Sequence, residues 1–68
     1  MSYEYSIGDV FHGQYAHKLY AETFEQALNR AKTEMGGYDH VEIRSVFKNE
    51  NNVTCFGNAL WDNKTGEV

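Results

Sequence analysis

Histidine and cysteine side chains are the residues of this sequence with the most versatile chemistry, because they bind metals and act as bases or nucleophiles. The 68-residue chain contains three histidines and one cysteine: His12, His17, His40 and Cys55. No pair of them has the spacing of a ligand motif such as HExxH or CxxC. The sequence therefore predicts no metal site and no cofactor.

The carboxylates show no catalytic pattern either. Asp9, Asp39 and Asp62 lie in turn-like segments, where aspartate is favoured because its side chain bonds to the backbone. Cys55 lies in the middle of a predicted strand and is expected to face the core, where a thiol is inert. No pair of side chains is placed by the sequence for acid–base catalysis. We therefore predict a protein that is not an enzyme and has no catalytic residues.

Aromatic and cationic residues occur together on the predicted strands, and further polar and cationic residues occur on the predicted helix, so both surfaces are candidates for binding. A sheet face that displays tyrosine or phenylalanine beside lysine or arginine can stack on bases or contact a protein. The predicted partner-binding residues are Lys18, Tyr20, Asn29, Arg30, Lys32, Arg44 and Phe56. A purely structural interpretation also stays open, in which the rings cover the edges of a thin core and the charges keep the surface solvated.

The segment from Thr23 to Gly37 has the pattern of one amphipathic helix. Thr23 can cap the first turn, and Gln26 three residues later completes a capping box. Gly36 and Gly37 are expected to end the helix in the left-handed conformation. The apolar stripe of the helix consists of Phe24, Ala27, Leu28, Ala31 and Met35.

Alternating apolar and polar residues predict strands on both sides of the helix. The expected ranges are 2–7, 15–21, 40–47 and 53–61. Gly8 and Asp9 are expected to form a bulge, and residues 12–14 and 48–52 to form turns. Residues 62–68 show no periodicity and are predicted to fray.

This order of elements predicts a single small α+β domain over residues 1–68, with a four-stranded antiparallel sheet and one helix on one face (ββαββ). In the second strand, Tyr15 is expected to share a face with Leu19. We expect the helix to cover Tyr5, Leu19, Ile43, Cys55 and Ala59. The opposite, open face would then carry Lys18, Tyr20, Glu42, Arg44, Val46, Phe56 and Leu60. Trp61 either seals one end of the core or anchors a partner, and the sequence leaves both interpretations open.

Composition limits the class of partner. Ten acidic residues against six basic ones give a net charge of −4, which argues against binding nucleic acid through charge alone. The sequence shows neither a signal peptide nor an apolar stretch of about 20 residues, so we expect a cytoplasmic protein without membrane contact. A short chain buries a small core, which favours a homodimer.

Three segments resemble the small stand-alone α+β proteins of bacteriophages and mobile elements, including some anti-CRISPR proteins. They are the aromatic first strand at residues 3–7, the capped helix at 21–32 and the hairpin at 40–61 that closes on tryptophan. The resemblance concerns the layout over most of the chain. It implies inhibition by stoichiometric contact with a host RNA-guided complex, with Arg30, Lys32 or the open sheet face as contact points.

The preferred hypothesis is thus a non-enzymatic interaction protein that binds and modulates or inhibits a protein or ribonucleoprotein partner. One alternative is a small module that binds single-stranded nucleic acid on the open sheet face. Another is an accessory subunit of an oligomeric enzyme.

Overall fold

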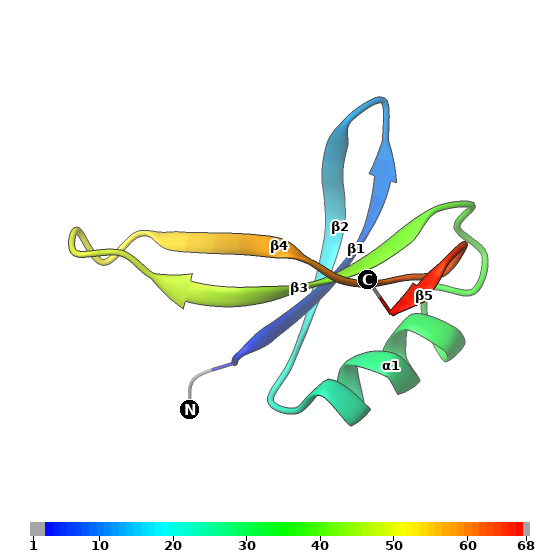
Figure 1. Ribbon diagram of the computed structural model, residues 1–68, viewed down its shortest axis with the longest axis horizontal. Coiled ribbons are helices and arrows are strands. Elements are labelled where there is room, and N and C mark those ends of the chain that lie inside the picture. Colours follow the sequence, from blue (N-terminus) through cyan, green and yellow to red (C-terminus); the bar gives the residue numbers. More distant parts are fainter. Residues whose placement is uncertain (1–2, 68) are drawn as a thin grey trace.

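The computed structural model describes residues 3–67, which form one curved antiparallel sheet with a single helix beside it (Figure 1). Ser2, the first residue of the predicted first strand, and Val68, the last residue of the predicted tail, lie outside the described residues. The elements are β1 (Tyr5–Phe11), β2 (Gln14–Ala21), α1 (Phe24–Thr33), β3 (Val41–Lys48), β4 (Thr54–Asp62) and β5 (Gly66–Glu67).

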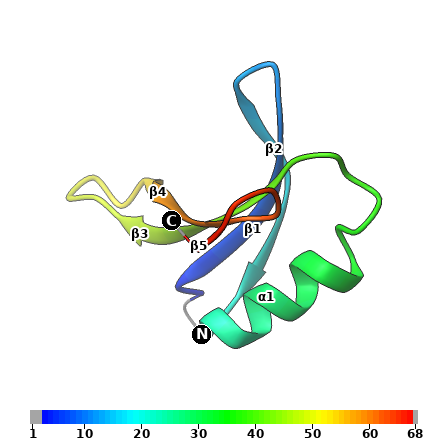
Figure 2. The ribbon, with the colours of Figure 1, turned by 45° about the vertical axis from the view of Figure 1, so that its right-hand side comes forward.

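The strand order is β2-β1-β3-β4-β5, and every neighbouring pair is antiparallel. The predicted α+β fold with ββαββ order is confirmed, and the short β5 extends the four predicted strands to five. Helix α1 lies against one face of β1, β2 and β3, while the outer part of the β3–β4 hairpin extends beyond it (Figures 1 and 2). The described part of the chain holds no helix with the length and apolar character needed to cross a membrane.

The helix begins where the sequence predicts. Thr23 Oγ1 accepts a hydrogen bond from the Gln26 N–H at 3.2 Å, and Gln26 Oε1 accepts one from the Glu22 N–H at 3.2 Å. The capping box is therefore reciprocal, although the returning bond reaches one residue before the cap. The apolar stripe is also confirmed, because Ala27, Ala31 and Met35 are buried and both Phe24 and Leu28 pack against them.

The end of the helix differs from the prediction. Neither Gly36 nor Gly37 has a positive φ, and the helix ends at a right-handed Glu34. The Arg30 carbonyl accepts hydrogen bonds from the N–H groups of Glu34 at 2.8 Å and Met35 at 3.2 Å, and the helix ends without a left-handed residue.

Removing the cap gives a first test of this local structure. We expect Thr23→Ala to lower the free energy of unfolding by about 1 kcal/mol, because the Gln26 N–H loses its acceptor. Urea denaturation followed by circular dichroism measures the change. Thr33→Ala is the matched control, since Thr33 lies at the other end of α1 and bonds only back to the Asn29 carbonyl. Equal losses in the two variants would contradict a specific capping role.

The β1–β2 hairpin changes the predicted face of one aromatic residue. Its two-residue turn, His12 and Gly13, has positive φ at both positions, as type I′ hairpin turns require. The predicted irregularity at Gly8 and Asp9 is present, but the extra residue lies on β2, where Ile7 pairs with Leu19 and Asp9 with Ala16. His17 adopts a φ of 51° there. Because this bulge reverses the alternation, Tyr15 packs on the open face and not with Leu19.

The β3–β4 pairing corrects two further assignments. Ile43 pairs with Trp61, yet Arg44 pairs with Ala59, so Ala59 lies on the open face and not under the helix. Cys55 pairs with Phe47 in the outer part of the hairpin and lies outside the buried core cluster. That cluster consists of Ile7, Ala21, Ala27, Ala31, Met35, Val41 and Ile43. Trp61 packs against it, which supports the interpretation of Trp61 as a core seal.

The predicted frayed tail is ordered over residues 62–67. Asn63 fixes it to β3, because its N–H donates to the Val41 carbonyl at 3.0 Å and its Oδ1 accepts from the Val41 N–H at 2.9 Å. Its side-chain amide also donates to the Asp39 carbonyl at 3.1 Å. The tail is therefore held by hydrogen bonds of one polar residue, which an analysis of hydrophobic alternation does not detect. Strand β5 follows after the turn.

Candidate functional site

Tyr15 lies at the centre of a cluster on the open sheet face. Its ring crosses Gly8, where an added Cβ would lie only 2.9 Å from the ring and 2.8 Å from the Ala16 carbonyl oxygen. The Tyr15 hydroxyl and the buried Ser6 hydroxyl are 2.8 Å apart and share a hydrogen bond. Burial raises the pKa of Tyr15 to about 12, although its hydrogen bond to Ser6 and the charge of Arg44 act in the opposite direction.

Three of the predicted binding residues surround this ring. Phe56 meets Tyr15 edge to face at 5.6 Å between ring centroids, the Arg44 guanidinium lies 4.7 Å from the Tyr15 centroid, and Lys18 Nζ lies 5.3 Å from the Phe56 centroid. The distances of Arg44 and Lys18 from these ring centroids are in the range of cation–π interactions. Glu42 Oε1 also accepts hydrogen bonds from Arg44 Nε at 3.0 Å and from Nη2 at 2.7 Å. The charged groups and aromatic rings of this cluster therefore contact mainly one another.

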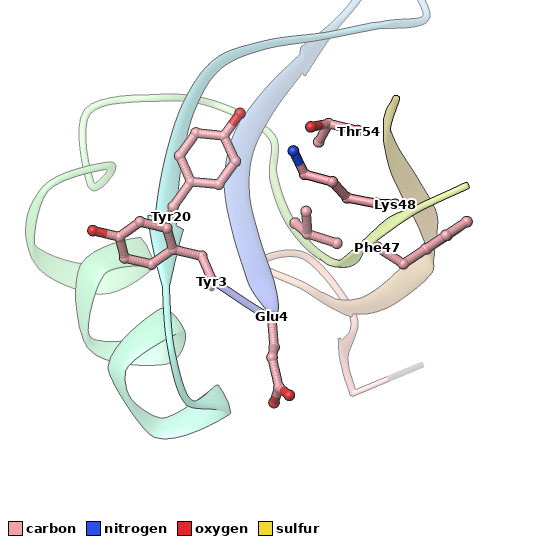
Figure 3. A pocket seen from close by; sticks show the side chains of 7 residues that line it. Tyr3, Glu4, Tyr20, Phe47, Lys48 and Thr54 are labelled. Atoms are coloured by element: carbon pink, nitrogen blue, oxygen red, sulfur yellow. The ribbon is translucent and has the colours of Figure 1, made fainter. Parts of the chain in front are cut away.

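Tyr20 lies on the same open face but belongs to a different surface. Its ring centroid is 6.0 Å from that of Tyr3, and the two rings form one side of a groove (Figure 3). Residues from β3 and the start of β4 form the other side, with the Lys48 amino group directed toward the opening. The groove measures about 580 Å³ and is lined by Tyr3, Glu4, Tyr20, Val46, Phe47, Lys48 and Thr54.

The aromatic lining of this groove is open to solvent. The exposed fractions are 48% for Tyr3, 37% for Tyr20 and 52% for Phe47. Figure 3 shows the Tyr3 and Tyr20 rings along one side of the groove, whereas the Phe47 ring points away from them. The two exposed tyrosine rings form a surface of the type that marks binding sites. Lys48 and Glu4 add one charge of each sign at its rim.

The remaining predicted residues lie on the outer surface of α1. Asn29, Arg30 and Lys32 are exposed there. Arg30 forms an i, i+4 ion pair with Glu34, with Nη1 and Oε2 3.3 Å apart. Since α1 covers the face of the sheet opposite the Tyr15 cluster, the seven predicted residues do not form one site.

Sequence reasoning missed Tyr15 and most of the groove. Tyr15 was assigned to the wrong face because the bulge at His17 leaves no clear signal in the alternation. Tyr3, Phe47, Lys48 and Thr54 come from segments that only the sheet pairing brings together. Two groove residues, Tyr20 and Val46, were expected on the open face, and the pairing of Val46 with Phe56 confirms this for Val46.

The histidines and the cysteine also lie apart among the described residues. His12 is in the β1–β2 turn, His17 Nδ1 pairs with Asp9 Oδ1 at 2.8 Å, and His40 Nε2 pairs with Asp62 Oδ2 at 2.5 Å. Cys55 lies in β4, and its thiol contacts the Val53 carbonyl at 3.5 Å. They do not form the four-residue ligand set that the sequence analysis considered.

Fold and surface together define a small α+β domain with an exposed aromatic groove on its open sheet face. Comparisons of the chain with protein-family models, with curated proteins and with solved structures found no match.

Proposed function

We propose that this protein is a non-enzymatic binding protein that modulates a macromolecular partner, and that the partner is a protein whose apolar side chain enters the groove beside Tyr20. The observation that carries the proposal is the exposure of the Tyr3 and Tyr20 rings along one side of the groove. Tyrosine is enriched among the residues that dominate binding energy, since it buries a large rigid ring and keeps a polar group for the rim.

Charge favours a protein over a nucleic acid at this groove. The groove carries one charge of each sign, Lys48 and Glu4, and the chain carries a net charge of −4, so the groove lacks the clustered positive charge that a phosphate backbone requires. The cations Lys18 and Arg44 already lie over the Tyr15 and Phe56 rings. These rings meet edge to face, which makes them a poorer stacking platform than parallel exposed rings.

The finer form of the proposal concerns the kind of partner. The resemblance to small phage proteins supports a bacterial protein or ribonucleoprotein complex, of the CRISPR–Cas type, that is inhibited by stoichiometric occupation of one surface. In that case the partner's activity should fall in proportion to added protein and vanish near one equivalent. The same proposal includes a cytoplasmic location. The predicted homodimer is tested separately, by determining the mass of the protein in solution.

Binding through the groove is tested with Tyr20→Ala. We expect affinity capture from nuclease-treated bacterial lysate to recover a partner with the unmodified protein. Tyr20→Ala should weaken binding of that partner, once purified, by about 30-fold, because a dominant interface residue contributes about 2 kcal/mol or more. The change is measured as a dissociation constant by calorimetry.

Tyr38→Ala is the matched control. Tyr38 is exposed to the same 37% as Tyr20 and also contacts one ring, that of His17, but it lies outside the groove. Equal affinities of the two variants would contradict the proposed site. Recovery of nucleic acid alone, lost on nuclease treatment, would favour the single-strand binding module instead. Recovery within an oligomeric enzyme would favour the accessory subunit.

A further inference from the structure

Three ionisable side chains meet at the junction of β3, β4 and the β4–β5 turn, away from the groove. Glu42 in β3 pairs across the sheet with Asp62 in β4, and His40 directly precedes β3. The backbone of His40 is fixed because its carbonyl accepts a hydrogen bond from the Val10 N–H at 2.8 Å. The three side chains are therefore held by paired strands and not by a free loop.

Their ligand atoms converge. His40 Nε2 lies 2.5 Å from Asp62 Oδ2 and 3.7 Å from Glu42 Oε2, and all three atoms lie within 4.8 Å of one another. Each side chain is largely shielded, with exposed fractions of 28%, 13% and 15% for His40, Glu42 and Asp62. Partial burial of this kind protects a bound ion from competing water.

The other oxygen of each carboxylate is occupied by a neighbouring donor. Asp62 Oδ1 accepts a hydrogen bond from the Lys64 N–H at 2.7 Å, and Glu42 Oε1 accepts those of Arg44. Such outer contacts orient ligating carboxylates in metal sites.

We propose that His40, Glu42 and Asp62 bind one divalent transition-metal ion of the zinc type. Zinc bonds of about 2.0–2.1 Å to nitrogen and oxygen at a tetrahedral angle separate two ligand atoms by about 3.3 Å. That value lies between the two separations observed from His40 Nε2, so shifts of less than about 1 Å in Asp62 and Glu42 would bring both carboxylate oxygens to this separation from the imidazole nitrogen.

The donor set selects the class of metal. One imidazole nitrogen with two carboxylate oxygens suits zinc and its neighbours in the transition series, whereas magnesium and calcium prefer oxygen alone. Two carboxylates also outweigh the single positive charge that Arg44 brings to Glu42. Three protein ligands leave one coordination position for water, and the bound ion would join the start of β3 to the end of β4.

Calorimetric titration of the unmodified protein with Zn²⁺ at neutral pH tests the proposal. We expect saturable binding of one ion per chain, together with a change in the fluorescence of Trp61, the one tryptophan of the chain, which adjoins Asp62. We expect Asp62→Asn to weaken zinc binding at least ten-fold, because the new side chain keeps an acceptor for the Lys64 N–H but loses the ligating charge. His40→Ala should abolish binding.

His12→Ala is the control for adventitious binding by an exposed imidazole, and it should bind zinc as the unmodified protein does. Circular dichroism confirms that each variant is folded. Absence of saturable binding by the unmodified protein up to about 1 mM Zn²⁺ would overturn the proposal and leave His40, Glu42 and Asp62 as a hydrogen-bonded cluster that binds no metal. Unchanged binding by both cluster variants, or loss of binding in His12→Ala, would overturn it equally.

Discussion

Ile43→Ala is expected to lower the free energy of unfolding by about 3 kcal/mol, the largest stability effect of the substitutions considered for this protein. Ile43 is completely buried, pairs with Ile7 in β1 and Trp61 in β4, and lies under α1. Truncating a buried isoleucine removes apolar contacts and leaves a cavity, which costs about 2–5 kcal/mol. A domain of this size has a total stability of about 3–10 kcal/mol, so a large part of it depends on this one side chain.

Urea denaturation followed by the Trp61 signal and by circular dichroism measures this loss. Val53→Ala is the control, since Val53 is also β-branched but is 54% exposed near the β3–β4 turn. Its substitution should change stability by less than about 0.5 kcal/mol. A loss below about 1 kcal/mol for Ile43→Ala would show that the core can close around the smaller side chain.

Local chemistry made the helix predictable. The Thr23 cap and the apolar stripe through Ala27 and Ala31 depend on residues that are only a few positions apart in the sequence. Neither depends on which strands pair with one another. The strands were recognisable for the same reason, because apolar and polar residues alternate along β1 and β3. In β3 this alternation matches one buried face, whereas β1 is buried on both faces from Ser6 to Asp9. Sequence reasoning therefore located each of the main elements.

Which sheet face a side chain occupies, and which residues form the site, depend on the register between strands, and the sequence of one segment does not show that register. The bulge at His17 reverses the side on which Tyr15 lies, and the irregular pairing of Arg44 with Ala59 does the same in β4. No composition signal precedes either shift. The groove and the His40 cluster combine residues of β3 and β4 with partners far away in the sequence, so only the register of the sheet brings them together.

Because of Tyr15, the free energy of unfolding is expected to fall at alkaline pH. The pKa of Tyr15 is raised by burial to about 12 in the folded protein, whereas a tyrosine in the unfolded chain has its ordinary value of 10.0. Below the unfolded value, both states keep the proton and the contribution of Tyr15 to stability is fully present. As pH rises from about 10 toward 12, the unfolded chain releases the proton first. Ionisation therefore favours unfolding, and the contribution is lost as pH approaches the folded value.

We expect the free energy of unfolding to fall by about 2 kcal/mol over this range through Tyr15, once partial solvent screening of the two-unit shift is allowed for. Tyr15→Phe should reduce this fall, because phenylalanine keeps the ring over Gly8 and has no proton to release. It should also lower stability near neutral pH by about 1 kcal/mol, since the buried Ser6 hydroxyl loses its hydrogen bond to Tyr15 and keeps only the longer one, at 3.5 Å, to the Arg44 carbonyl.

Tyr20→Phe separates this effect from the titration of the other groups. Tyr20 is exposed on the same sheet face, so removing its hydroxyl should leave the alkaline fall in stability as it is in the unmodified protein. Urea denaturation at about pH 9 and about pH 12 for the three proteins gives the comparison. If Tyr15→Phe and the unmodified protein lose stability in parallel, the ring would be open to solvent. The Tyr15 cluster would then be a surface free to receive a partner, and the preference for the groove as the binding site would have to be reversed.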